Sequence, residues 1–484
     1  MVISLPLEPA PVRFGTDGWR GLLGVDFTLE RLLSVAAAAA AELAASAPAE
    51  LPSREVVVGY DRRFMADALA SSVCAAVRGV GLEPMLASTA APTPAFSFAA
   101  VQRGALGALV ITASHNPPEW LGLKIKGPFG GSVADGFTAR VERRLTIAAV
   151  QPPQPGETPG FDPWPDYLAD LRAKVDCQAL ARGLRAMPLK VIVDSMHGAA
   201  AGAMAALLGD AVEEIRSRRD PLFGGHPPEP LDRHLPELIE RVRSSGTAQR
   251  PALGIGFDGD GDRIAAVDEC GSHCSTQLLL PLLIDHMAGR RGLPGAVVKS
   301  VSGSDLVTAV ARQHQRLVLE KAVGFKHIAA EMLAQPVVVG GEESGGLGFG
   351  IHLPERDGLL SALLTLEALV ARRQPLAVAS AALRDGVGLH SHYDRLDLRL
   401  PDMAARHRFE QVLAQDLPQQ LAGLAVGDVI RTDGVKLRLG GTRGCWLMCR
   451  FSGTEPLLRL YCEAADEASV ERLLTAAAAW VHSN

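Results

Sequence analysis

The chain has 484 residues, of which 48% are apolar, 21% charged and 5% aromatic, a composition that excludes a disordered, collagen-like or membrane-spanning chain. At roughly 100–200 residues per domain, this length predicts about three or four domains. The formal net charge of −6, from 54 acidic and 48 basic residues, leaves no global basic field. We therefore expect no nucleic-acid or membrane partner, and any anion site must be local.

Cysteine usage and the first residues favour a cytoplasmic protein. The seven cysteines are an odd number and include no C-x-x-C pair, as in a reduced chain. Cys270 and Cys274 lie beside His273, but no second ligand pair follows at a zinc-site spacing, so we expect no zinc. The first residues lack the basic segment and the long apolar run of a signal peptide. The alanine-rich run 35–49 is too short and too weakly apolar to span a bilayer, and predicts a buried helix.

In chain order, short β-branched runs alternate with helical stretches, a rhythm typical of βαβ units whose sheets are covered on both faces. Strands are predicted at 56–61, 107–112, 189–194, 297–301 and 336–340. Further helices are predicted at 65–77, 199–208 and 305–313. The C-terminal part differs, because alternating residues at 435–439 and 445–451 predict an antiparallel sheet accompanied by helices.

Three boundaries divide the chain. The segment 151–165 is too rich in proline for a helix or a central strand, and predicts an interdomain linker. Further boundaries are expected near 269–275 and 386–394. The predicted domains are therefore 1–160, 161–272, 273–388 and 389–484.

The first loop with candidate chemistry is Thr112-Ala-Ser114-His115-Asn116-Pro117, directly after a predicted strand. Proteins of the α/β class place reacting groups at the carboxyl ends of strands, and the His115 imidazole beside the Ser114 hydroxyl suits proton transfer. Taken alone, the pattern favours an ST-turn closed by Asn-Pro. Lys124 and Lys126 follow, two cations suited to a phosphoryl group or to proton transfer.

The second loop, Asp258-Gly-Asp260-Gly-Asp262-Arg263, lies between two apolar runs. Three carboxylates separated by glycines can converge on one hard cation, and the small number of ligands favours Mg²⁺ over Ca²⁺. An EF-hand is excluded although Glu269 falls at its twelfth position, because Arg263 stands where that loop requires glycine and the flanks predict strands. An Asp-rich hairpin without a metal would leave the clustered charges uncompensated.

Two further glycine-rich loops offer binding groups. In Gly340-Gly341-Glu342-Glu343-Ser344-Gly345-Gly346, the Glu342 carboxylate and the Ser344 hydroxyl would point the same way in an extended segment and bind neighbouring sugar hydroxyls. A glycine-rich acidic turn is the commoner explanation of that pattern. In Arg450-Phe451-Ser452-Gly453-Thr454-Glu455-Pro456, with Arg459 beyond it, the residues suit a cradle for a dianionic phosphate, and a surface turn is the alternative.

Together with Phe14-Gly-Thr-Asp-Gly-Trp-Arg20-Gly21, these loops closely resemble the motifs of the α-D-phosphohexomutase family, the phosphoglucomutases and phosphomannomutases. The resemblance covers essentially the whole chain, in the family's order and approximate spacing. It implies an α/β protein of four domains around a central cleft. The first three would share a mixed α/β core, and the last would be a TBP-like α+β domain.

The resemblance also implies a role for each matching residue. Ser114 would be the phosphoserine, and would hold Mg²⁺ together with Asp258, Asp260 and Asp262. The other residues around the transferring group would be Arg20, His115, Lys124 and Arg263. The substrate-binding residues would be Lys326, Glu342 and Ser344 for the sugar, and Arg450, Ser452, Gly453, Thr454 and Arg459 for the phosphate that is not transferring.

By this resemblance, the protein interconverts hexose 1-phosphate and hexose 6-phosphate, with Mg²⁺ as cofactor and hexose 1,6-bisphosphate as intermediate and activator. Phosphoryl transfer needs mainly positioning and charge neutralisation, which these loops supply. The segment Val323-Gly-Phe-Lys326-His327 resembles the Gly-aromatic-Lys element of glucose-type enzymes and favours glucose over mannose. Gly345-Gly346 stands where many relatives carry Gly-His, so a histidine contact to substrate is absent there.

Several alternatives remain open from the sequence. The sugar loop lacks the glutamine typical of the glucosamine branch, which disfavours glucosamine phosphate. A phosphomannomutase, a dual-specificity mutase and a glucose 1,6-bisphosphate synthase loaded from an external bisphosphate share the same motifs. A non-catalytic sugar-phosphate sensor is disfavoured because all the expected reacting residues are intact. We expect a monomer or a weak homodimer.

Overall fold

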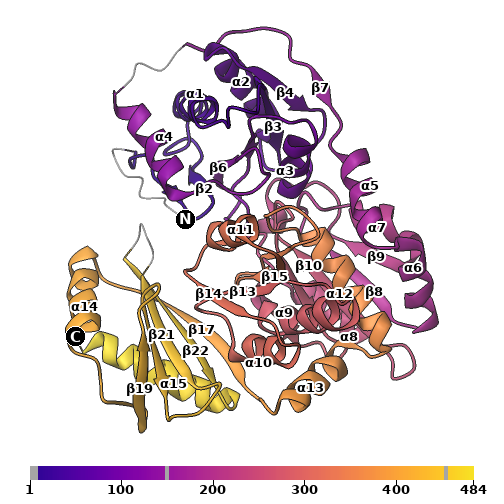
Figure 1. Cartoon of the computed structure of the whole chain (residues 1–484), viewed down its shortest axis with the longest axis vertical. Helices are drawn as coiled ribbons and strands as arrows, with labels where there is room; N and C mark the ends of the chain where they lie inside the picture. The colour runs from indigo at the N-terminus through magenta and orange to yellow at the C-terminus, as the bar shows by residue number, and fades with distance from the viewer. Residues whose placement is uncertain (1–8, 148–151, 452–455, 484) are drawn as a thin grey trace.

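A computed structural model describes residues 9–147, 152–451 and 456–483 as four domains in chain order, here called domains I to IV (Figure 1). Domain I is indigo to purple in Figure 1, and domain IV, in orange and yellow, lies beside domain III. Each domain is built on its own sheet. The four-domain α/β architecture predicted from the sequence is confirmed.

Domain I contains a mixed seven-stranded sheet in the order β1-β2-β6-β5-β3-β4-β7. Its strands are β1 Phe14–Gly15, β2 Gly18–Leu22, β3 Glu55–Tyr60, β4 Glu83–Ala87, β5 Ala108–Ile111, β6 Trp120–Lys126 and β7 Gly160–Phe161. Its helices are α1 Leu29–Ala45, α2 Ala66–Gly79, α3 Thr93–Gln102 and α4 Asp135–Ile147. In β3, Val57 packs in the cluster that contains α3, whereas Val56 and Val58 pack with α1 and α2. Consecutive valines are all buried because helices cover both faces of this sheet.

Domains II and III repeat the plan with smaller sheets, β12-β11-β10-β8-β9 and β14-β13-β15-β16. Domain II comprises α5 Trp164–Lys174, α6 Cys177–Ala186, β8 Lys190–Asp194, α7 Ala203–Leu208, β9 Val212–Ile215, α8 Pro236–Ser245, β10 Ala252–Phe257, β11 Ile264–Val267 and β12 His273–Cys274. Domain III comprises α9 Thr276–Ile284, β13 Ala296–Ser300, α10 Asp305–Gln313, β14 Val318–Lys321, α11 Phe325–Ala334, β15 Val337–Gly341, β16 Leu347–Phe349, α12 Gly358–Arg372 and α13 Leu376–Val387.

Domain IV contains the antiparallel sheet predicted for the C-terminal part, in the order β17-β22-β21-β20-β19-β18. Its elements are β17 His392–Arg399, α14 Met403–Gln415, β18 Gln420–Leu421, β19 Leu424–Ile430, β20 Val435–Leu439, β21 Trp446–Phe451, β22 Leu457–Ala464 and α15 Glu467–His482. Its main cluster of buried apolar residues is separate from the clusters of the other domains.

The same strand–loop–strand arrangement occurs in domains I to III. A parallel strand ends at a loop, and the next strand returns antiparallel to it: β5 and β6, β10 and β11, β15 and β16. The three loops between these paired strands contain Ser114, Asp258 and Glu342 respectively. In domain IV, β21 and β22 form a comparable antiparallel pair, and residues 452–455 between them lie outside the described residues. The fold therefore places each candidate loop at a strand end.

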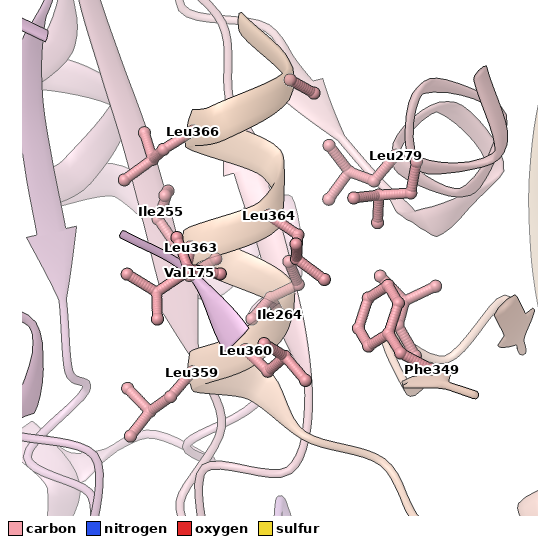
Figure 2. Packing of buried hydrophobic residues seen from close by; sticks show 14 of the residues in the cluster. Val175, Ile255, Ile264, Leu279, Phe349, Leu359, Leu360, Leu363, Leu364 and Leu366 are labelled. Atoms are coloured by element: carbon pink, nitrogen blue, oxygen red, sulfur yellow. The ribbon is translucent and has the colours of Figure 1, made fainter. Parts of the chain in front are cut away.

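Helix α12 packs among buried apolar residues of domains II and III (Figure 2). The same hydrophobic core includes residues of domain I. Leu359 and Leu363 of α12 belong to the same cluster as Val57 of domain I and Ile255 of domain II. Asp357 caps the helix by accepting the N–H of Leu360 at 2.8 Å. Because Leu363 is fully buried, shortening it to alanine is expected to cost about 2–5 kcal/mol of stability.

Two predicted elements differ in the structure. The helix expected at 199–208 begins only at Ala203, because the preceding residues form a turn in which Gly202 has a φ of +86°. The proline-rich segment 151–165 is not all linker. Its Gly160–Phe161 pairs with β4 at the edge of the domain I sheet, and α5 already begins at Trp164. Among the described residues, no helix is both long and apolar enough to cross a membrane.

Candidate active site

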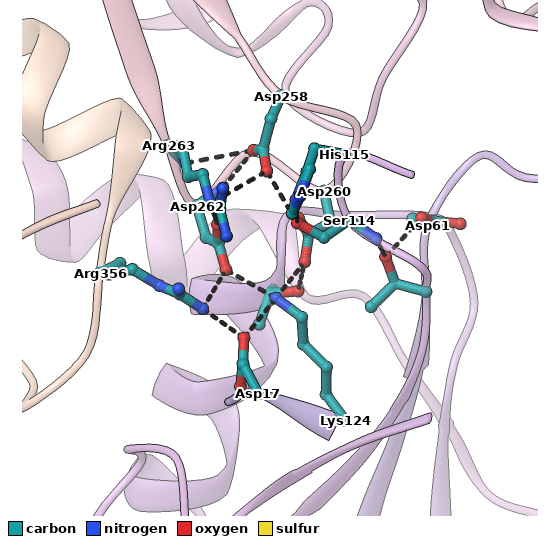
Figure 3. A network of polar contacts seen from close by, with 12 residues as sticks. Asp17, Asp61, Ser114, His115, Lys124, Asp258, Asp260, Asp262, Arg263 and Arg356 are labelled. Carbon is teal, nitrogen blue, oxygen red and sulfur yellow. Dashed lines mark hydrogen bonds and ion pairs between the residues drawn. The ribbon is translucent and has the colours of Figure 1, made fainter. Parts of the chain in front are cut away.

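Ser114 lies in the loop between β5 and β6, and its side chain is fully buried. Its Oγ donates to Oδ2 of Asp258 at 2.9 Å and lies 3.3 Å from Nδ1 of His115. Its backbone has a φ of +54°, a left-handed conformation uncommon for serine. Domain I thus presents this hydroxyl to the acidic loop of domain II (Figure 3).

Lys124 is the centre of the charge cluster beside Ser114. Its Nζ lies 2.7 Å from a carboxylate oxygen of Asp17, 2.7 Å from Asp260 and 2.6 Å from Asp262. Burial opposes the charged amine, but the three carboxylates outweigh burial and raise the pKa of Lys124. This lysine therefore joins the acidic groups of domains I and II.

The acidic loop suits a metal ion. Asp258, Asp260 and Asp262 are fully buried, and one oxygen of each lies within 4.8 Å of the others. Within the described parts of the chain, no hydrogen-bond donor reaches Oδ1 of Asp260 or Oδ1 of Asp262. Burial and the two neighbouring carboxylates raise the pKa of Asp258 well above its usual value. Three converging carboxylates with carboxylate oxygens that no donor reaches fit Mg²⁺, which these three residues would hold.

The remaining predicted catalytic residues surround this cluster. Nη1 of Arg20 donates to Oδ1 of Asn116 at 2.7 Å, and Nε of Arg263 lies 3.9 Å from Asp258 and 3.7 Å from Asp262. Burial, together with Arg263, Arg20 and Lys124, lowers the pKa of His115 well below its usual value. The imidazole next to Ser114 is therefore neutral at ordinary pH, and each of its two nitrogens can take a different role in proton transfer.

Arg356 was not among the predicted site residues. It is a buried residue between β16 and α12 that contacts acidic residues of domains I, II and III. Its guanidinium pairs with Asp17, lies 2.8 Å from Asp262 and 3.9 Å from Glu342. A Cβ at Gly346 would lie only 2.3 Å from Cδ of Arg356. The arginine thus occupies the space that a side chain at position 346 would need. The charged run Glu355-Arg356-Asp357 after a strand was the available signal.

The sugar loop differs in shape from the prediction. Residues 343 and 344 form a turn rather than an extended segment, so the argument that Glu342 and Ser344 point the same way is wrong. Glu342 accepts the N–H of Gly324 at 2.7 Å, and burial raises its pKa to about 7. The backbone carbonyl of Ser344 lies 3.5 Å from Nη1 of Arg263. Lys326 pairs with Asp135 of domain I, near the Asp17 segment.

Two arginines face each other on the domain IV sheet. Arg450 of β21 pairs in register with Arg459 of β22, and like charges placed so are unfavourable without an anion. Asp433 accepts from Nε of Arg450 at 2.8 Å, whereas Nε of Arg459 is buried without a hydrogen-bond partner among the described residues. Within the same residues, neither arginine is hydrogen bonded to the Ser114 cluster. The predicted contacts of Ser452, Gly453 and Thr454 lie outside the described residues.

Comparison with known proteins identifies the family. Models of the phosphoglucomutase/phosphomannomutase family match residues 11–149 (alpha/beta/alpha domain I), 165–271 (domain II), 276–385 (domain III) and 413–479 (C-terminal domain). The chain therefore belongs to the phosphoglucomutase/phosphomannomutase family, within the α-D-phosphohexomutase superfamily.

Relatives match over nearly the whole chain. The phosphoglucosamine mutase of Halorhodospira halophila is 32% identical over 483 residues, with 95% of this chain and 94% of the relative covered. The phosphoglucomutase/phosphomannomutase of Thermococcus kodakarensis is 27% identical, with 95% and 96% covered. A crystal structure from Thermus thermophilus named as a phosphomannomutase superposes on this chain with a TM-score of 0.84. The two sequences are 33% identical, and the match covers 98% of this chain and 100% of the other. Membership supports a hexose-phosphate mutase activity without fixing the hexose.

Proposed function

We propose that this protein interconverts hexose 1-phosphate and hexose 6-phosphate through a phosphorylated Ser114, with glucose phosphate as its preferred substrate. The observation that carries the proposal is the convergence of the Ser114 hydroxyl, the acidic loop and Lys124 in one buried cluster. Such a cluster supplies the positioning and charge neutralisation that phosphoryl transfer needs.

In the proposed reaction, a sugar hydroxyl attacks the phosphorus of phosphoserine. A new bond forms between that oxygen and phosphorus, the bond from phosphorus to Oγ of Ser114 breaks, and the hydroxyl proton ends on Oγ. The neutral imidazole of His115, with Nδ1 3.3 Å from Oγ, is suited to carry that proton. Lys124, Arg20 and Arg263 would bind the oxygens of the transferring group.

Bound Mg²⁺ would supply positive charge to the phosphoryl oxygens next to Ser114. Asp258, Asp260 and Asp262 would hold it in place. The Lys124 amine, which contacts Asp260 and Asp262, would add positive charge for the same phosphate. Lys124 thus adds a cation to the same buried cluster as Ser114.

The first half-reaction produces hexose 1,6-bisphosphate. The sugar then has to turn over, so that its other phosphate reaches Ser114 and regenerates phosphoserine. A second phosphate site must hold whichever phosphate is not reacting. We assign that task to Arg450 and Arg459, with Ser452, Gly453 and Thr454, because the opposed arginines favour a dianion between them.

Glucose phosphate is favoured by the link between two segments of domain III. Glu342 accepts the N–H of Gly324, so the sugar loop is tied to the segment Gly324-Phe325-Lys326 that resembles glucose-type enzymes. Glucosamine phosphate is the second candidate, because relatives such as the Halorhodospira halophila enzyme are named phosphoglucosamine mutase. Its ammonium group would suit a carboxylate such as Glu342.

The test is a substrate comparison with purified protein and Mg²⁺. Glucose, mannose and glucosamine 1-phosphates are supplied with and without the matching 1,6-bisphosphate, and kcat/KM is measured for each. We expect the largest kcat/KM with glucose 1-phosphate. A larger value with glucosamine or mannose 1-phosphate would change the assigned sugar. Accumulation of the bisphosphate would indicate a synthase, and no conversion of any sugar would contradict the proposal.

A further inference from the structure

Arg63 is a buried arginine that contacts the backbone of the Ser114 loop. It follows β3, and its side chain is only 1% exposed. Its Nη2 donates to the carbonyls of Ser114 at 2.7 Å and Asn116 at 2.6 Å. Its Nη1 donates to the carbonyls of Pro117 at 2.9 Å and Trp120 at 3.1 Å. One guanidinium therefore holds four carbonyls of the chain that leads from Ser114 to β6.

Arg63 is also linked to the N–H of Ser114, through Asp61 and Thr112. Asp61 lies 3.3 Å from Nε of Arg63, and its Oδ2 accepts the hydroxyl of Thr112 at 2.6 Å. Oγ1 of Thr112 in turn accepts the N–H of Ser114 at 2.8 Å. Both backbone polar groups of Ser114 are thus held by Arg63 and Asp61, directly or through one hydroxyl.

This arrangement explains how Ser114 keeps an uncommon conformation. A left-handed φ of +54° costs free energy for a serine, on the order of 1–2 kcal/mol, and persists only where the surroundings enforce it. Buried carbonyls also need donors. The planar fork of arginine can serve four carbonyls at once, whereas a lysine ammonium has only three donors at a single point.

Arg63 also contacts domain II, which carries Asp258. The Phe223 ring lies under the guanidinium, 4.9 Å from its carbon to the ring centre. Arg219 donates to the carbonyl of Arg63 at 3.1 Å. The residue that shapes the Ser114 loop is therefore packed against the domain to which Ser114 donates its hydrogen bond.

We propose that Arg63 is a positioning residue for phosphoryl transfer: it acts through the backbone of residues 114–120 and keeps Oγ of Ser114 directed at Asp258. Its side chain contacts the loop backbone, Asp61 and Phe223, and its carbonyl accepts from Arg219. Its loss therefore affects the reacting oxygen more than substrate affinity. The expected effect on kcat rests on the proposed function, whereas the expected effect of Arg63 on the conformation of the Ser114 loop does not.

Arg63→Met is the test variant, and Arg62→Met is the matched control. Arg62 is the preceding residue and also donates to a backbone carbonyl, but that of Ser217 in domain II at 2.8 Å. Amide hydrogen exchange is measured by mass spectrometry over residues 113–120, where Asn116 donates to Ala113 and Trp120 to Pro117. We expect exchange about tenfold or more faster in Arg63→Met and unchanged exchange in Arg62→Met.

Kinetics provide the second measurement. Arg63→Met is expected to lower kcat about 10²-fold with KM changed less than about threefold, since a misplaced reacting atom slows chemistry without removing substrate contacts. Arg63→Lys is expected to give smaller changes of the same sign in both measurements, and it replaces Arg63→Met if the latter does not fold. Arg62→Met is expected to keep wild-type kcat.

The outcomes separate the two proposals. Unchanged exchange over 113–120 in Arg63→Met and Arg63→Lys would overturn the positioning role, whatever reaction the protein catalyses. Equal losses of kcat in the variants of Arg62 and Arg63 would do the same. Absence of mutase activity in the wild-type protein would instead contradict the proposed function. Hydrogen exchange over 113–120 would still test the positioning role of Arg63.

Discussion

The Ser114 cluster and the domain IV sheet differ in how they are held. The cluster lies where domains I, II and III meet, and those domains share one hydrophobic core around α12. Domain IV has its own core. Opposite charges in the cluster pair with one another, as Lys124 does with Asp17, whereas on the domain IV sheet Arg450 faces Arg459 and pairs only with Asp433 among the described residues. The reacting groups are thus preorganised, and the candidate phosphate site belongs to a more separate unit.

Domains III and IV contact each other through a small apolar cluster that includes Val301 and Trp446, and through a buried carboxylate, Glu463. Glu463 of β22 is fully buried and accepts four hydrogen bonds. Two come from domain III, the hydroxyl of Ser304 at 2.5 Å and the N–H of Asp305 at 2.9 Å. Two come from domain IV, the indole of Trp446 at 2.6 Å and the hydroxyl of Ser391 at 2.6 Å. This carboxylate orients the domain IV sheet against domain III without merging their main cores.

The largest expected effect is at the nucleophile. Ser114→Ala removes the oxygen that would carry the phosphate, so we expect kcat to fall by about 10⁴-fold or more. Intact mass spectrometry should show one phosphate on the wild-type protein and none on the variant. A variant with full mutase activity would rule out Ser114 as nucleophile.

Removal of the metal should be nearly as damaging, because the acidic loop would then repel the phosphate. Chelation is expected to abolish turnover and added Mg²⁺ to restore it. Asp260→Asn should lower kcat about 10²-fold. Asp210→Asn, in an exposed pair with Arg185, is the control and should keep wild-type activity. Full activity in excess chelator would contradict a metal at this site.

The third prediction separates phosphate binding in domain IV from sugar binding in domain III. Arg450→Ala should raise KM for glucose and mannose phosphates by a similar factor, corresponding to about 1.5–3 kcal/mol for a lost charged hydrogen bond. Glu342→Ala should instead change the ratio of their kcat/KM values. The two loops would exchange roles if Arg450→Ala changed sugar preference and Glu342→Ala did not.

The smallest expected effect concerns the packing of Arg356 within the cluster. Gly346→Ala places a methyl group against Cδ of Arg356, whose guanidinium is held by Asp17 and Asp262, so we expect a loss of about 1–3 kcal/mol in unfolding free energy. Gly427→Ala is the control, because its nearest neighbour would be 3.7 Å away. Equal melting temperatures for both variants would show that Arg356 can move aside.

The sequence by itself determined the order of the domains and the loops that carry candidate chemistry. Strand and helix patterns, and glycine-rich loops that follow strands, depend on residues close together in the chain, so they can be predicted from the sequence. The Asp258 loop between two strands was predicted for that reason, and the structure agrees. The helix start at Ala203 and the turn at Ser344 differed, because a local backbone bend overrode the residue pattern.

Only the tertiary structure decided which charges meet. Lys124 and Asp262 are 138 residues apart in the chain, and Arg356 and Asp17 are 339 apart. The charged run around Arg356 marks it as a candidate, but the residues around Arg63 and Arg356 do not indicate which distant loops the two side chains contact. Such pairs form because packing around α12 brings distant loops together, and a buried charge is tolerated only beside a partner.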